Sequence, residues 1–92
     1  MTGSVDAQLR SFVDVAVADL THRLNVDAAG VTVVSARAMT WPDRSVGCPQ
    51  PGMAYPQTQV DGTLIELSVG GTVYRYHSGG SRSPFLCENA SP

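Results

Sequence analysis

The stretch TLIELSVGGTVYRYH, at residues 63–77, predicts a tight β-hairpin. Gly70 and Gly71 separate two runs in which apolar and polar residues alternate, and two-residue turns of this kind need the positive φ that glycine adopts easily. Because side chains alternate between the two faces of a strand pair, one face of this hairpin is the predicted core and the opposite face carries an exposed ion pair. On the first face we expect the pairs Val69 with Thr72, Leu67 with Tyr74 and Ile65 with Tyr76; on the second, Ser68 with Val73, Glu66 with Arg75 and Leu64 with His77.

An N-terminal helix is predicted over residues 5–24. Apolar side chains recur there at spacings of three and four, which places them on one helical face. Ser4 is the predicted N-cap, and Asn25 is the predicted C-terminal stop. The apolar face consists of Leu9, Phe12, Val13, Ala16, Leu20 and Leu24.

A first strand is predicted over residues 31–40, where β-branched residues follow a turn that ends at Gly30. We expect Val34, Ala36 and Ala38 to face the helix. The predicted fold is therefore α+β, with an N-terminal amphipathic helix packed on a three-stranded antiparallel sheet in the order α-β-β-β.

A long loop, residues 41–62, joins the first strand to the hairpin. Its many prolines fix φ and remove backbone donors, so we expect an extended, semi-rigid segment with turns at positions 42–43 and 51–52. Loops of this length in compact domains often carry function. A glycine- and serine-rich tail, residues 78–92, completes a single predicted domain that spans residues 1–92.

Composition argues against a nucleic-acid partner and against an integral membrane segment. The chain has 92 residues and a formal net charge of −2, and its six basic residues are arginines scattered along the sequence. Because nucleic-acid binding needs clustered positive charge, we expect no nucleic-acid partner. No run approaches the roughly 20 apolar residues of a membrane span, so we expect no integral membrane segment.

The two cysteines, Cys48 and Cys87, are candidates for a disulfide bond. Such a bond would close a loop of about 40 residues and contribute about 4 kcal/mol in the chain-entropy model, a large share of the stability of so small a domain. It would also imply an oxidising compartment. The alternative is a pair of reduced thiols in a cytosolic protein. A zinc site is not expected, since there is no CxxC motif and the histidines are only His22 and His77.

A longer pattern surrounds these cysteines. The string WPDxSxGCPxPGMxY at residues 41–55, followed by YxYH at residues 74–77 and by Cys87, resembles a family of small, uncharacterised bacterial domains that are often exported or lipid-anchored. The resemblance implies a cell-envelope or extracellular location and supports the pairing of the cysteines. It supplies no activity, cofactor or catalytic residues. The N-terminus does not look like a secretory signal, so if the protein is exported we expect a signal or anchor outside this sequence. A cytoplasmic location is the alternative.

Catalysis by a cysteine nucleophile is the least favoured function. It would use Cys48 as the thiolate, His77 as the base and Asp43 as the group that orients the base. A disulfide would abolish it. We instead expect His77 to bind a carbonyl or pack on Trp41, and Asp43 to accept hydrogen bonds within a capped turn that includes Ser45. We therefore predict no enzyme activity, no metal and no cofactor.

Two functions remain for the long loop. In the favoured one, the domain is a non-enzymatic binding module whose residues 49–55 contact a protein or peptide partner, with protease inhibition as a special case. In the alternative, the loop is structural, and Trp41 and Tyr55 close a second small core with Leu64, Val73 and His77. Exposure of Met53 and Tyr55 would favour binding, and burial would favour the structural role. The predicted binding residues are Trp41, Pro49, Gln50, Pro51, Met53, Tyr55 and His77.

Overall fold

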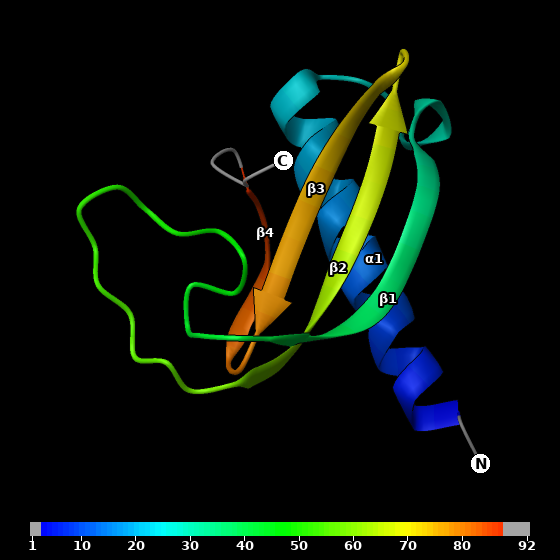
Figure 1. Cartoon of the computed structure of the whole chain (residues 1–92). Coiled ribbons are helices and arrows are strands. Elements are labelled where there is room, and N and C mark those ends of the chain that lie inside the picture. The colour runs from blue at the N-terminus through cyan, green and yellow to red at the C-terminus, as the bar shows by residue number, and fades with distance from the viewer. Residues whose placement is uncertain (1–2, 88–92) are drawn as a thin grey trace.

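The computed structural model describes residues 3–87, and side chains from Gln8 onward. One helix lies across one face of a four-stranded antiparallel sheet in which neighbours in sequence are neighbours in space (Figure 1). No helix in this described part of the chain is long and apolar enough to cross a membrane. The elements are α1 (Gly3–Leu24), the short 3₁₀ turn η1 (Ala28–Gly30), β1 (Thr32–Trp41), β2 (Val60–Val69), β3 (Thr72–Gly79) and β4 (Arg82–Leu86).

Helix α1 begins two residues earlier than predicted and ends where predicted. The predicted cap, Ser4, falls within the helix, and its side chain lies outside the described part of the structure. At the other end, Asn25 has a φ of 56°, and the Val26 amide donates to the Thr21 carbonyl at 3.1 Å. The left-handed conformation of Asn25 lets the Val26 amide satisfy one of the last carbonyls of the helix, which confirms the predicted stop.

The hairpin formed by β2 and β3 has the predicted register at all six predicted pairs. Alternation along the two strands then decides which side chains the helix covers. Large apolar side chains on one face of the hairpin pack under the C-terminal half of α1, and they are fully buried. This inner core contains Ala16, Leu20, Ile65, Leu67 and Tyr76.

The opposite face carries the predicted ion pair between Glu66 and Arg75. The Arg75 Nε donates to the Glu66 carboxylate at 3.0 Å, and the Ser35 hydroxyl donates to the same group at 2.8 Å. The Ser35 bond, together with Arg75, lowers the pKa of Glu66 below its usual value. Because the arginine side chain is half exposed, the pair contributes about 1 kcal/mol at most.

The prediction of three strands was wrong, because the predicted tail contains a fourth. Strand β4 pairs with β3 at the edge of the sheet. Its pairing shifts between two registers, so Ser83 and Pro84 lie opposite the single residue Ser78. Proline cannot donate to a ladder, but an edge strand with such a bulge accommodates it.

The predicted inward set of β1 was partly wrong. Val34 is an extra residue between the pairs that β1 makes with β2, and it is 52% exposed. A bulge of this kind reverses the alternation of side chains along the strand. Ala36 does pack against the inner core, whereas Ala38, on the same face, is exposed at the border of a cleft.

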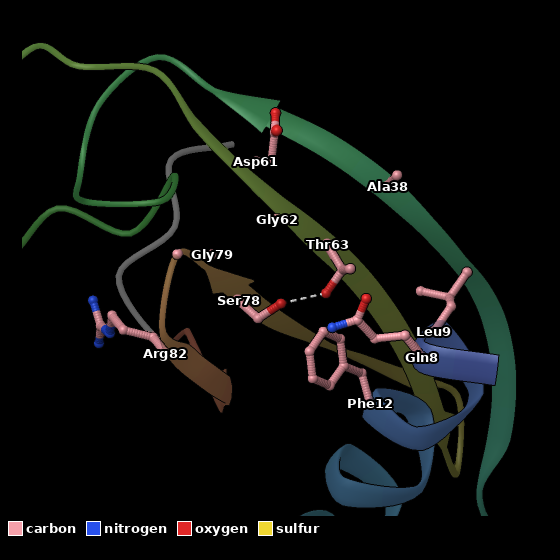
Figure 2. Close-up of a pocket in the computed structure, with 11 residues that line it drawn as sticks. Gln8, Leu9, Phe12, Ala38, Asp61, Gly62, Thr63, Ser78, Gly79 and Arg82 are labelled. Atoms are coloured by element: carbon pink, nitrogen blue, oxygen red, sulfur yellow. Dashed lines mark hydrogen bonds between the residues drawn. The ribbon is translucent and has the colours of Figure 1, made fainter. Parts of the chain in front are cut away.

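That cleft, the α1–sheet cleft, lies between the N-terminal half of α1 and the sheet (Figure 2). Here the sheet presents small side chains instead of the large ones of the inner core. Thr63 and Ser78 are both buried, and their hydroxyls are hydrogen-bonded to each other. Leu9 and Phe12 on the helix are consequently only half-buried.

The helix is also tied to the sheet by a hydrogen bond that depends on pH. The Tyr76 hydroxyl donates to the Asp19 carboxylate at 2.7 Å, and Arg23 donates to the same oxygen. Burial works against the charge of Asp19, but these donors outweigh it and lower its pKa below the usual 3.8. Burial, and then the neighbouring carboxylate, raise the pKa of Tyr76 above the usual 10.0. The phenol therefore stays a donor at neutral pH.

A Tyr76→Phe variant should lose about 1 kcal/mol of stability at pH 7, because the Asp19 carboxylate loses its buried donor. A carboxylate with a lowered pKa stabilises the fold above the unfolded value of 3.8, and this contribution disappears as the pH falls through the lowered pKa. The difference between wild type and variant should therefore shrink below pH 4 or so. Urea unfolding at pH values from 2 to 7 measures it, with Tyr74→Phe as the matched control. A difference that is constant over this range would contradict the assignment.

Candidate functional site

The base of the long loop is a turn held by Asp43. The Ser45 amide donates to the Asp43 carboxylate at 2.9 Å, and the Ser45 hydroxyl donates to the same oxygen. The hydroxyl, followed by the amide, lowers the pKa of Asp43. This is the predicted capped turn, in which the carboxylate accepts hydrogen bonds from the residue two positions further along the chain.

The turn directs Val46 back onto the sheet. Its φ is 48°, a left-handed conformation that costs a β-branched residue about 1–3 kcal/mol. Burial offsets this cost, since the side chain is almost fully buried. Gly47 follows with a φ of 76°, and a Cβ at that position would overlap the Trp41 ring. Only glycine fits there.

Val46 belongs to a second apolar cluster, the outer cluster, on the sheet face opposite α1. Trp41, from the end of β1, is its largest member, and the Trp41 Nε1–H donates to the Ser78 carbonyl at 2.8 Å. The ring is thereby fixed across three strands. Buried in this cluster are Trp41, Val46 and Leu64, with Met39, Val60 and Phe85 packed around them.

His77 lies inside the same region and has a structural role. Its ring stacks on Trp41, with centroids 4.8 Å apart and planes inclined by 8°. Its Nδ1 lies 2.7 Å from the Val46 carbonyl, and since a carbonyl only accepts, Nδ1 carries the hydrogen. Both contacts predicted for His77 are therefore present. Its Nε2 is buried without a hydrogen-bonding partner within residues 3–87.

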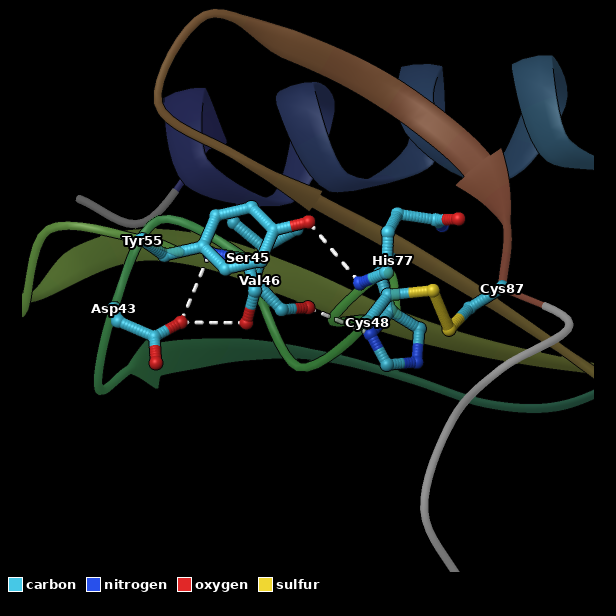
Figure 3. The surroundings of a disulfide bond; sticks show 8 residues. Asp43, Ser45, Val46, Cys48, Tyr55, His77 and Cys87 are labelled. Carbon is cyan, nitrogen blue, oxygen red and sulfur yellow. Dashed lines mark hydrogen bonds between the residues drawn. A yellow bond between two sulfur atoms is a disulfide. The ribbon is translucent and has the colours of Figure 1, made fainter. Parts of the chain in front are cut away.

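A disulfide bond closes the base of the loop (Figure 3). Cys48 follows the turn, Cys87 follows β4, and their Cα atoms are 5.8 Å apart. The Cys87 amide also donates to the Arg75 carbonyl at 2.9 Å, which extends the pairing of β4 by one residue. The predicted pairing of Cys48 with Cys87 is thus present, and it fastens the loop to the far edge of the sheet.

The loop tip, residues 49–55, projects beyond this anchor. The Met53 amide donates to the Gln50 carbonyl at 3.2 Å, and Gly52 has a φ of 80°, so the predicted turn at positions 51–52 is present. The Gln50 amide donates to the Tyr55 hydroxyl at 3.1 Å, which links the beginning of the tip to its end (Figure 3). Met53 points outward and is 62% exposed.

The structure divides the predicted binding residues into two groups. Trp41 and His77 are buried at the outer cluster, and the other five lie in the loop tip. The predicted second core exists, but its composition was partly wrong. Tyr55 is half-buried and Val73 is 44% exposed, and among the described residues neither belongs to the outer cluster.

Four members of the outer cluster were missed by the sequence prediction. Alternation offered a signal for some of them: Met39 lies two residues before Trp41, and Val60 lies four residues before Leu64, so each shares a face with a predicted member. No local pattern indicates that a loop valine folds back onto the sheet. The missed residues are Met39, Val46, Val60 and Phe85.

The geometry does not assemble a cysteine-dependent catalytic site. The Cys48 sulfur is bonded to Cys87, so it carries no thiolate for His77 to activate. Asp43 directs its carboxylate to Ser45. Within residues 3–87 no group of three or more histidine, cysteine, aspartate or glutamate side chains is placed to hold a metal ion.

Comparison with known protein families gives a match over most of the chain. A family described as Domain of unknown function (DUF8738) matches residues 13–87, which include most of α1, the whole sheet, the long loop and both cysteines. No curated protein and no solved structure matches the chain. The match covers well over half of the sequence, and the chain belongs to the DUF8738 family of domains of unknown function.

Proposed function

We propose that this domain is a non-enzymatic binding module whose loop tip, residues 49–55, contacts a protein or peptide partner. The observation that carries the proposal is that the tip is exposed and yet held in shape. Met53 is 62% exposed, while a backbone turn and the Tyr55 hydroxyl bond hold the segment from which it projects.

A segment held in this way loses little conformational freedom when it binds. Ordering a flexible side chain at an interface costs about 0.5–1.5 kcal/mol, and ordering a backbone segment adds to that cost. In the loop tip, Pro49 and Pro51 restrict φ, and the disulfide fixes the residue immediately before the tip. Binding energy from contacts is therefore retained as affinity.

The chemistry of the tip favours an apolar contact with a polar rim. Methionine is flexible and polarisable, and it adapts to irregular partner surfaces. Exposed proline and glutamine residues precede it at positions 49–51. A partner with a shallow apolar pocket that accepts Met53 fits this surface, and a protease cleft that accepts an extended loop is a special case.

The structural alternative applies to the base of the loop. Residues 41–48 supply two of the three buried members of the outer cluster and one half of the disulfide. The tip contributes none of the described members of that cluster. We therefore assign the base to folding and the tip to binding.

The proposed location is the cell envelope or the extracellular space of a bacterium. The disulfide supports it, because such bonds form and persist in oxidising compartments. The absence of catalytic function is likewise part of the proposal, supported by the oxidised state of Cys48.

Selection from a displayed random-peptide library against the immobilised, oxidised domain tests the proposal. We expect peptide binders whose affinity falls at least about tenfold when Met53 is replaced by aspartate, since a central anchor contributes about 2 kcal/mol or more. Isothermal titration with the selected peptides measures the change.

The matched control is Val34→Asp, which changes an apolar residue of similar exposure on β1. It should leave the affinity of the same peptides within about twofold. Binders that respond equally to both substitutions, or that ignore Met53→Asp, would show that the loop tip is not the binding surface.

A further inference from the structure

The α1–sheet cleft has a volume of about 190 Å³ and lies on the sheet face opposite the outer cluster. It exists because the two ends of the helix meet different parts of the sheet. Tyr76, Ile65 and Leu67 fill the space under the C-terminal half of α1. Under the N-terminal half, the floor of the cleft is formed by the small side chains of Thr63 and Ser78. The residues around the cleft are Gln8, Leu9, Phe12, Ala38, Asp61, Gly62, Thr63, Ser78, Gly79, Gly80 and Arg82.

Two glycines beside the cleft, Gly62 and Gly79, are required by the other face of the sheet. A Cβ on Gly62 would overlap the Ser78 carbonyl, and one on Gly79 would meet the Val46 side chain at 2.6 Å. Glycine at these positions lets the outer cluster approach the strands.

The floor of the cleft is polar and neutral. The hydroxyls of Thr63 and Ser78 are hydrogen-bonded to each other, and both residues are at least nine-tenths buried. Two hydroxyls in such a pair place one hydrogen between them, so the accepting hydroxyl keeps its own hydrogen available to a further acceptor. Figure 2 shows the Gln8 amide close to this pair and the Phe12 ring beside it.

The charged residues stand at the rim and do not reach the floor. The guanidinium of Arg82 lies 4.1 Å from the centroid of the Phe85 ring, where it makes a cation–π contact. The Asp61 side chain is exposed. A charged ligand on the floor would lose its hydration without an opposite charge beside it, which disfavours ions.

We propose that this cleft binds a small neutral ring compound that carries one hydroxyl or carbonyl oxygen. Leu9 and Phe12 contact its apolar body, and the hydroxyl pair of Thr63 and Ser78 donates to its oxygen. The volume sets the size: a cavity of about 150 Å³ holds benzene, while sites for drug-sized ligands are about 300–1,000 Å³. This site is independent of the loop tip.

Phenol and benzene are the probes that test the proposal. Titrated into the oxidised domain and followed by amide NMR spectra, phenol should shift the resonances of Gly62, Gly79 and Gly80 along a saturable curve. Benzene should bind the same site about 5- to 30-fold more weakly, because it leaves the hydroxyl pair without an acceptor.

Two variants locate the binding. Ala38→Leu should abolish the phenol shifts by filling the cleft from β1, at an exposed position that folding tolerates. Arg37→Leu is the matched control on the opposite face of the same strand, and should leave them unchanged. The proposal is overturned if phenol causes no saturable shifts, if benzene binds as tightly, or if Ala38→Leu binds phenol like the wild type.

Discussion

Replacing Trp41 with alanine is expected to lower the free energy of unfolding by about 3–5 kcal/mol. The substitution empties the centre of the outer cluster and removes the ring on which His77 stacks. It also leaves the Ser78 carbonyl without its indole donor in a buried position. Trp41→Phe retains an aromatic ring and loses the donor, so it should cost less.

Chemical denaturation of the oxidised proteins measures these changes. The control is Met53→Ala, because an exposed side chain in the loop tip should change stability by no more than about 0.5 kcal/mol. This contrast separates the two groups of predicted binding residues: Trp41 stabilises the fold, and Met53 is available to a partner. Equal losses for both substitutions would contradict that division.

Removing the disulfide with the double substitution Cys48→Ser and Cys87→Ser should cost about 4 kcal/mol, since a link between residues 39 positions apart restricts the unfolded chain strongly. For a domain of this size, a loss of that magnitude is a large fraction of the total stability. Both cysteines are buried, so cavities left by the smaller hydroxyls and their unpaired polar atoms act in the same direction.

Removing the disulfide should weaken the turn at the base of the loop locally, in addition to lowering the global stability. Hydrogen exchange at the Val46 and Cys48 amides, which bond to the Asp43 and Ser45 carbonyls, should accelerate in the double-serine variant. Amides of Ile65 and Tyr76, in the buried centre of the β2–β3 hairpin, should exchange at rates set by global unfolding alone. Unchanged protection in the turn would mean that the outer cluster, and not the disulfide, holds the loop base.

The hairpin could be predicted from sequence because everything that fixes it is local. Gly70 and Gly71 define the turn, and period-two alternation on both sides defines the register and the buried face. The same holds for the helix stop at Asn25 and for the turn at Asp43. In each case the interacting groups are close in sequence, so residue types and spacing are sufficient.

The missed features depend on contacts between distant segments. Strand β4 contains Pro84, which locally argues against a strand, and only its position at the edge beside a bulge makes it compatible with one. Alternation alone places Val34 inward, because it gives no sign of the bulge that turns this residue outward. The return of Val46 to the sheet requires an unfavourable φ, which only the burial seen in the folded protein explains.

Pulling on the chain would load its segments unequally, because the disulfide places most of the sheet inside a covalent ring. Tension that arrives at Cys48 passes through the sulfur atoms to Cys87 and bypasses residues 49–86. The 39 positions between the cysteines would otherwise add about 130 Å of extended length. While the bond is intact, mechanical stretching can unravel α1 and β1 but cannot lengthen the segment that contains the loop tip.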